Sequence, residues 1–140
     1  MEKITSILSR KQSHFNYVSS SSLVSDALSK MSCQDIDYVV VINEDQQFAG
    51  IVTEHDIASK VIAVNRPMSK TKVSDIMNNR LPYASSYDTV EECMQLMQRH
   101  HTRYIPVFDD FNFVGVISSE DILSEAVYNR LEIFDAKMIY

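Results

Sequence analysis

The sequence predicts a mixed α/β (α+β) protein made of two copies of one β-α-β-β-α unit, packed about a pseudo-twofold axis. Residues 24–41 align with residues 90–107 at an offset of 66. The chain's two glycines, Gly50 and Gly115, also align, at an offset of 65. A repeat that keeps several features in register over this length indicates a duplicated structural unit.

The predicted elements follow the same order in both copies. A short extended piece precedes an amphipathic helix, two strands joined by a polar turn, and a second helix. In the first copy the extended piece, the two strands and the second helix are expected at residues 16–19, 38–42, 48–53 and 54–64. In the second copy they are expected at residues 81–85, 104–108, 113–118 and from 119 onward.

The first helix of each copy is predicted to bury one apolar face. That face carries Leu23, Ala27, Leu28 and Met31 in the first copy, and Val90, Cys93, Met94 and Met97 in the second. The segment "DTVE", Asp88–Glu91, has the pattern of a capping box and predicts the start of the second copy's helix.

The sequence divides into four predicted parts. The first repeat takes residues 1–66, including a lead-in helix with Ile4, Ile7 and Leu8 at helical spacing, and a linker follows from Pro67. The linker, the second repeat and a helical tail are expected at residues 67–77, 78–130 and 131–140. Because one small copy cannot bury a full core, we expect the two copies to pack together.

Composition excludes several classes of protein. Thirteen basic residues against 19 acidic ones give a net charge of -6, which argues against a nucleic-acid or anionic-membrane surface. The longest wholly apolar stretch, Tyr38–Ile42, is far shorter than the roughly 20 residues that span a bilayer. No apolar signal region is visible, so we expect a cytoplasmic protein. Cys33 and Cys93 form no ligand pattern, which predicts buried or idle thiols in a reducing compartment.

Both glycines belong to a repeated segment, "GIVTEHD" in the first copy and "GVISSED" in the second. In each, a hydroxyl residue is followed three positions later by an aspartate, which is the pattern of a helix cap. The same groups can bind a ligand. A hydroxyl at a helix start can donate to phosphate, an aspartate can accept from two ribose hydroxyls, and a glycine leaves room for a base or sugar. Both interpretations stay open on the residues alone.

The paired segments, the strand "YIPV" and the intervening "VSDIM" together resemble a tandem of cystathionine-β-synthase (CBS) domains, over about residues 3 to 130. The small stand-alone bacterial CBS-pair proteins are the most similar. The resemblance implies a usually non-catalytic module, often dimeric. It also implies clefts between the copies that bind adenosine-containing ligands such as AMP, ADP, ATP, NAD or S-adenosylmethionine.

The resemblance assigns ligand roles by position. Asp56 and Asp121 would hold ribose, while Thr53 and Ser118 would bind phosphate or ribose. The position before the central strand often supplies a cation for phosphate. The other expected ligand residues lie in the motif, at the ends of the extended pieces or at the start of the central strands: His55, Ser19, Ser20, Ala84, Tyr38, Tyr104.

The two copies differ in charge at the predicted site. Arg103 precedes the second central strand, but Asp37 stands at the matching position of the first, where it would repel phosphate. The family's strand proline is Pro106 in the second copy and is replaced by Val40 in the first. We therefore expect one competent nucleotide site, at Arg103. Protonation of His55 would strengthen phosphate binding at acid pH.

Other functions find less support in the sequence. No Gly-x-Ser-x-Gly, P-loop or HExxH motif is present, so no enzyme is predicted. His100 and His101 are expected to cap a helix or face solvent, with His14 elsewhere, and no metal site is expected.

The function that we predict is a cytoplasmic regulatory module. It binds an adenine nucleotide, requires no other cofactor, forms a homodimer and acts on an unidentified regulated protein. The alternative is a structural dimerisation or protein-interaction unit whose cleft binds nothing. The charge at Asp37 and the missing proline favour this alternative.

Overall fold

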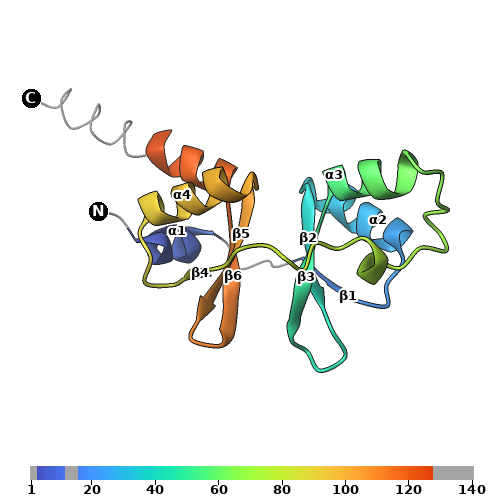
Figure 1. Ribbon diagram of the computed structural model, residues 1–140, viewed down its shortest axis with the longest axis horizontal. Helices are drawn as coiled ribbons and strands as arrows, with labels where there is room; N and C mark the ends of the chain where they lie inside the picture. The colour runs from blue at the N-terminus through green and yellow to red at the C-terminus, as the bar shows by residue number, and fades with distance from the viewer. Residues whose placement is uncertain (1–2, 12–15, 128–140) are drawn as a thin grey trace, which may run out of the picture. The chain divides into compact units, whose positions relative to one another are not determined.

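The computed structural model describes residues 3–11 and 16–127. They form two compact units, one from residues 16–80 and the other from residues 3–11 together with 81–127. We call them the first-repeat unit and the second-repeat unit. In each, helices gather on one side of a three-stranded sheet (Figure 1).

The first-repeat unit contains the sheet β1-β2-β3. β1 pairs with β2 in parallel, and β2 pairs with β3 as an antiparallel hairpin. The helix after β3 begins as α-helix and continues as a π-helix, where the sequence predicted one regular helix. In chain order the elements are β1 (Tyr17–Ser19), α2 (Val24–Gln34), β2 (Tyr38–Ile42), β3 (Phe48–Thr53), α3 (Glu54–Ile57), the π-helix Ala58–Ile62 and a 3-10 turn, Val73–Asp75.

The second-repeat unit has the same topology, with sheet order β4-β5-β6. β4 is parallel to β5, and β5 is antiparallel to β6. A helical segment at residues 119–127 follows β6. The elements are α1 (Ile4–Arg10), β4 (Ala84–Ser85), α4 (Val90–His100), β5 (Tyr104–Asp109) and β6 (Asn112–Ser118).

The strand registers confirm the predicted repeat. Gly50 lies opposite Val41, and Gly115 lies opposite Val107, with a shift of register directly after both valines. Pro106 accounts for one difference between the sheets. In the first-repeat unit Val40 donates its N–H to the carbonyl of Asn16. Proline has no N–H to donate, so β4 is one residue shorter than β1.

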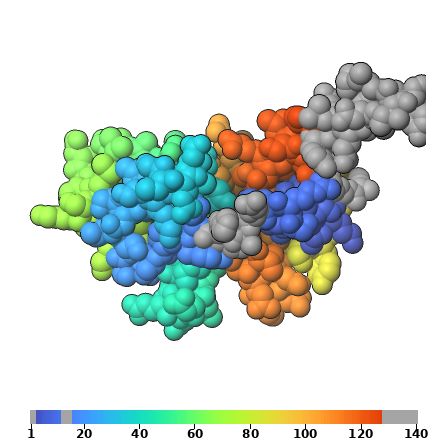
Figure 2. Space-filling model, turned by 180° about the vertical axis from the view of Figure 1, so that it is seen from behind, coloured from blue at the N-terminus to red at the C-terminus, as the bar shows by residue number. Residues whose placement is uncertain are grey.

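The lead-in helix departs from the predicted domain division. The sequence assigned residues 1–66 to one repeat, but α1 packs in the second-repeat unit, where Ile4 and Ile7 are buried in its core. An antiparallel bridge joins Lys3 to Thr89, the N-cap of α4. Figure 2 shows these first residues in deep blue, against the red and yellow parts of the chain.

The predicted linker is also part of a core. Val73 and Ile76 are buried in the first-repeat unit, and Lys72 bridges to Leu23, the N-cap of α2. This bridge matches the one between Lys3 and Thr89, because Leu23 and Thr89 are equivalent in the repeat. The segment "KVSDIM" at 72–77 therefore packs in the first-repeat unit as "KITSIL" at 3–8 packs in the second. The predicted tail, 131–140, lies outside the described residues.

The helix faces confirm most of the predicted core. In α2, Ala27 and Met31 are buried, and so are their equivalents Cys93 and Met97 in α4. Met94 is an exception, because 43% of its surface is exposed.

The cap of α4 lies one residue away from the predicted position. Thr89 is the N-cap and accepts from the Glu92 N–H at 3.2 Å. The pattern "DTVE" predicted Asp88 as the cap. The Asp88 carboxylate instead accepts from the Ser85 N–H at 2.9 Å. The aspartate therefore closes the turn that joins β4 to α4, while the neighbouring threonine caps the helix.

Candidate functional site

The hydroxyl–aspartate pair of the first repeat forms the predicted helix cap at the β3–α3 corner. The Asp56 N–H donates to Thr53 Oγ1 at 3.1 Å, and the Thr53 N–H donates to Asp56 Oδ2 at 2.9 Å. The Thr53 hydroxyl also donates to Asp56 Oδ2, at 3.0 Å. This reciprocal arrangement is a capping box, so Asp56 has a structural role whether or not a ligand binds.

Ser118 and Asp121 make the same two backbone contacts in the second repeat. The Asp121 N–H donates to Ser118 Oγ at 3.1 Å, and the Ser118 N–H donates to Asp121 Oδ2 at 2.8 Å. The Asp56 side chain is 12% exposed and the Asp121 side chain is 20% exposed. The second corner therefore repeats the first and leaves its carboxylate more accessible.

A lysine contacts each aspartate, and neither lysine is among the residues predicted for the site. Lys60 Nζ lies 3.2 Å from Asp56 Oδ1, one helical turn along the same helix. Lys11 Nζ lies 2.8 Å from Asp121 Oδ2, although the two residues are 110 positions apart. The spacing of Asp56 and Lys60 could have indicated the first pair. No local pattern indicates the second.

The backbone carbonyls of Asp37 and Arg103 occupy equivalent positions. The Glu54 N–H donates to the Asp37 carbonyl at 3.0 Å, and the Ser119 N–H donates to the Arg103 carbonyl at 2.9 Å. Each residue therefore lies at the first turn of the helix that carries the candidate aspartate. The Arg103 side chain is exposed, so a cation stands beside the second corner and an acid beside the first.

Tyr38 and Tyr104 lie at the same corners. Tyr38 is the strand partner of Thr53, and Tyr104 is the strand partner of Ser118. Both tyrosines are partly buried. The structure therefore brings the tyrosine, the hydroxyl residue and the aspartate of each repeat to the same corner.

The remaining predicted residues lie elsewhere in their units. Ser19 pairs with Ile42, at the end of β2 opposite to Tyr38, and the Ser20 N–H donates to the Ile42 carbonyl. The two ends of β2 are separated by about 13 Å at the usual rise of a strand. Ala84 is 1% exposed and packs in the core of the second-repeat unit, so its side chain is not available to a ligand.

Gly50 has a structural explanation that the ligand hypothesis did not foresee. A Cβ at this position would lie 2.8 Å from the backbone oxygen of Asn78. Asn78 bridges to Ile51 through two backbone hydrogen bonds, of 2.9 and 3.1 Å. The expectation that this glycine leaves room for a base or sugar is therefore wrong, because residues 77–78 of the protein fill the space.

The histidines and cysteines divide by exposure. His101 is the C-cap of α4 in the left-handed conformation, which confirms the predicted capping role, and His100 and His55 are exposed. His14 lies outside the described residues. Within residues 3–11 and 16–127, no three His, Cys, Asp or Glu side chains are placed to hold a metal ion. Cys93 is buried as predicted, but Cys33 is exposed.

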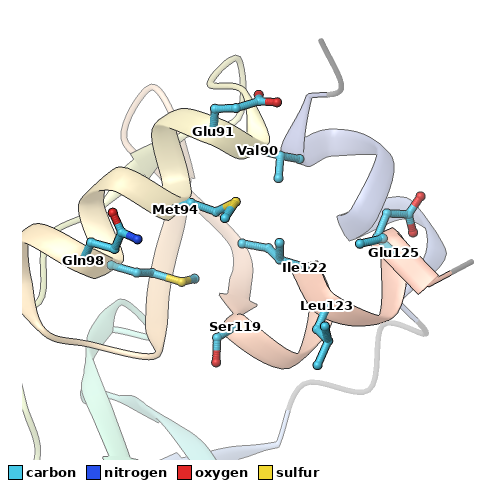
Figure 3. Close-up of a pocket in the computed structure, with 10 residues that line it drawn as sticks. Val90, Glu91, Met94, Gln98, Ser119, Ile122, Leu123 and Glu125 are labelled. Atoms are coloured by element: carbon cyan, nitrogen blue, oxygen red, sulfur yellow. The ribbon is translucent and has the colours of Figure 1, made fainter. Parts of the chain in front are cut away.

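An apolar groove between α4 and the helical segment 119–127 was missed in the sequence analysis. It has a volume of about 510 Å³. Figure 3 shows Met94 and Ile122 pointing toward one another across it. Leu123 at its edge is 65% exposed. The exposure of Met94, which helical spacing assigned to the core, follows from this groove.

The comparisons with known proteins identify the family. The described residues form two small α/β repeats, and each repeat has a hydroxyl–aspartate cap at the same corner. The CBS domain profile matches this chain twice, over residues 6–63 and 73–128. The chain therefore belongs to the CBS-domain family and has the fold of a CBS-pair regulatory module. The second match begins at residue 73, although residues 73–80 pack in the first-repeat unit.

Individual relatives agree with this assignment. The chain is 35% identical over 113 residues to the CBS domain-containing protein CBSX3, mitochondrial, of Arabidopsis thaliana. The match covers 78% of this chain and 55% of that protein, so the chain spans just over half the relative's length. A protein with CBS domains from Burkholderia ambifaria has a similar structure, with a TM-score of 0.84 and 31% identity over 90% of this chain and 94% of that one.

A third similar protein, like the second, is known from a solved structure. The hexameric CBS-CP12 protein of bloom-forming cyanobacteria matches with a TM-score of 0.76 and 26% identity, over 88% of this chain and 70% of that one. In the described part of this chain, no helix has the length and apolar character needed to cross a bilayer.

Proposed function

We propose that this CBS pair is a non-catalytic sensor that binds an adenosine-containing ligand, such as AMP, ADP, ATP, NAD or S-adenosylmethionine. Its principal ligand residues are Asp121, Ser118 and Arg103. Ligand binding changes the relative population of two conformations of the module. A regulated protein, or a second copy of the chain, binds one of these conformations in preference to the other. Family membership supports the regulatory role, and the chemistry of the second corner supports the ligand class.

The observation that carries this proposal is the number of hydrogen bonds that each carboxylate already accepts. A carboxylate has about four acceptor positions. The Asp56 oxygens accept from the Thr53 N–H, the Thr53 hydroxyl and Lys60. The Asp121 oxygens accept from the Ser118 N–H and Lys11, both at Oδ2. Asp121 Oδ1 receives neither bond, so the second corner retains more capacity for ribose hydroxyls.

Isothermal titration calorimetry with AMP, ATP, NAD and S-adenosylmethionine tests the proposal. We expect binding of at least one ligand by the wild-type chain. Asp121→Asn should weaken that binding by about 1.5–3 kcal/mol, because it removes the charge from the acceptor. Asparagine keeps one acceptor oxygen for the Ser118 N–H, so the capping contact survives.

Asp56→Asn is the matched control at the equivalent corner. We expect it to weaken binding less than Asp121→Asn does. Circular dichroism of both variants checks that each remains folded. Absence of heat from all four ligands at millimolar concentration would contradict the proposed function. Equal affinities for the wild type and Asp121→Asn would show that the ligand binds elsewhere.

The groove of the second-repeat unit supports a second candidate function, homodimerisation. Met94 and Leu123 expose apolar surface on two adjacent helices, and such a pair of helices can pack on its twofold-related copy. The hexameric state of the cyanobacterial CBS-CP12 relative shows that a protein of this fold assembles into oligomers. Dimerisation and ligand sensing are compatible, and dimerisation alone remains the function if no ligand binds.

Analytical ultracentrifugation tests the dimer. We expect Met94→Glu to convert a wild-type dimer to monomer, because it places a charge in an apolar contact. Phe111→Glu is the control. Phe111 is 98% exposed on the β5–β6 turn, so the change should leave the sedimentation coefficient unaltered. A monomeric wild type, or a dimer that persists in Met94→Glu, would count against dimerisation through this groove.

A further inference from the structure

The lysine at each capped corner also contacts a second part of its unit. In the second-repeat unit, Lys11 Nζ donates to Asp121 Oδ2 and to the Val116 carbonyl, both at 2.8 Å. Lys11 is the C-cap residue of α1. The ammonium group therefore holds the end of the lead-in helix against β6 and against the candidate ribose-binding aspartate.

The first-repeat unit makes the same connection, but its lysine lies on the helix that carries the aspartate and not on the lead-in segment. Lys60 Nζ lies 3.2 Å from Asp56 Oδ1 and donates to the Ile76 carbonyl at 3.0 Å. Ile76 belongs to "KVSDIM", the segment equivalent to "KITSIL" at residues 3–8, where α1 begins. In both units, a lysine thus joins the aspartate to a lead-in segment. Two different lysines make this link, which indicates that the link itself matters.

Ribose binding conflicts with this link in the second-repeat unit. A vicinal diol binds a carboxylate best when each hydroxyl donates to one oxygen. At Asp121, Oδ2 already accepts from the Ser118 N–H and from Lys11. The Ser118 N–H belongs to the helix cap and cannot move without opening the corner. Lys11 is a flexible side chain, 26% exposed, and is the group that a ribose hydroxyl can replace.

We propose that Lys11 is a further residue of the second-repeat ligand site, and that a ribose diol displaces it from Asp121 Oδ2. The displacement loosens the hold of α1 on the second-repeat unit. This inference rests on the proposed function and names how occupancy is transmitted. Other contacts of α1 persist, namely the buried Ile4 and Ile7 and the ion pair of Arg10 with Glu125. The helix therefore loosens and does not detach.

Hydrogen–deuterium exchange of the amides of residues 4–10 tests the inference on the full chain. We expect saturating AMP to accelerate their exchange by at least roughly two- to fivefold, the range for the loss of a surface ion pair, because the pair of Lys11 and Asp121 is less exposed than a surface pair. We expect 2′-deoxy-AMP, which lacks one hydroxyl of the diol, to produce a smaller acceleration at saturation. In Lys11→Met, the amides of residues 4–10 should exchange fast without ligand, and AMP should not accelerate their exchange further.

Lys60→Met provides the matched control. Lys60 makes the equivalent link in the other unit, so its loss should leave the exchange of residues 4–10 unchanged and their response to AMP intact. Binding of AMP by calorimetry without acceleration in residues 4–10 would overturn the role of Lys11 and leave the proposed function standing. Absence of heat with AMP, ATP, NAD and S-adenosylmethionine would end both. Equal acceleration by AMP and 2′-deoxy-AMP would overturn the displacement by the diol.

Discussion

The two capped corners share their hydrogen-bond geometry and differ in the segment that supplies the cation beside the aspartate. Both have a hydroxyl–aspartate pair with N–H···O distances of 2.8 to 3.1 Å. The cation at Asp56 comes from the same helix, and the cation at Asp121 comes from the N-terminal segment. The cap is therefore a local requirement of the fold. The source of the neighbouring cation is independent of the cap, because a different segment supplies the lysine in each copy.

Cysteine accessibility offers the largest expected contrast between the repeats. Cys93 occupies the core position of Ala27, and Cys33 occupies the exposed position of Arg99. Burial, with a smaller contribution from the Asp88 carboxylate, raises the pKa of the Cys93 thiol to about 12. At pH 8 a thiol reagent should modify Cys33 rapidly. It should modify Cys93 about a thousandfold more slowly, because Cys93 reacts only after an opening that costs about 4 kcal/mol.

Mass spectrometry of a labelling time course measures both rates, and denaturant should make them equal. Comparable rates in the folded chain would contradict the burial of Cys93. The raised pKa of Cys93 also determines the direction in which the free energy of unfolding changes with pH. The Cys93 thiol has a pKa of about 12 in the folded protein, whereas the ordinary pKa of a cysteine thiol is 9.0. The free energy of unfolding should therefore fall as pH rises between these values, by more in the wild type than in Cys93→Ala.

Gly50→Ala should destabilise the first-repeat unit by about 1–3 kcal/mol, the usual cost of overpacking a tight site. The added Cβ meets the Asn78 backbone, which no side-chain rotation can relieve. Urea denaturation measures the change. Hydrogen exchange should show the loss of protection concentrated in β3 and the neighbouring Asn78. A variant as stable as the wild type would mean that the Ile51–Asn78 bridge yields at little cost.

The helix ends offer the smallest expected effect. Asp35 and His101 are equivalent C-cap residues, with φ of 52° and 51°. Because glycine adopts this left-handed conformation without strain, Asp35→Gly and His101→Gly should each stabilise the protein by about 0.5 kcal/mol. Thermal denaturation should show a small rise in Tm for both. Ser29→Gly, at an exposed position inside α2, is the control and should lower Tm.

Sequence reasoning succeeded where structure depends on near neighbours. The hydroxyl and the aspartate of each corner are three residues apart, so their pairing follows from helix geometry alone. The alignment of Gly50 with Gly115 likewise predicted the repeat, and the strand registers confirm it. The same reasoning failed for Met94, because helical spacing identifies an apolar side chain without identifying what covers it.

Local patterns were thus enough to predict the repeat, the strands, the first helices and the capped corners. The packing of the lead-in segments became visible in the folded chain alone. The spacing of Ile4 and Ile7 indicates an apolar face, but both repeats offer apolar surface to receive it. The structure places α1 on the second-repeat unit, and only that choice brings Lys11 to Asp121. A contact between residues 110 positions apart depends on how the whole chain folds, and no short pattern in the sequence encodes it.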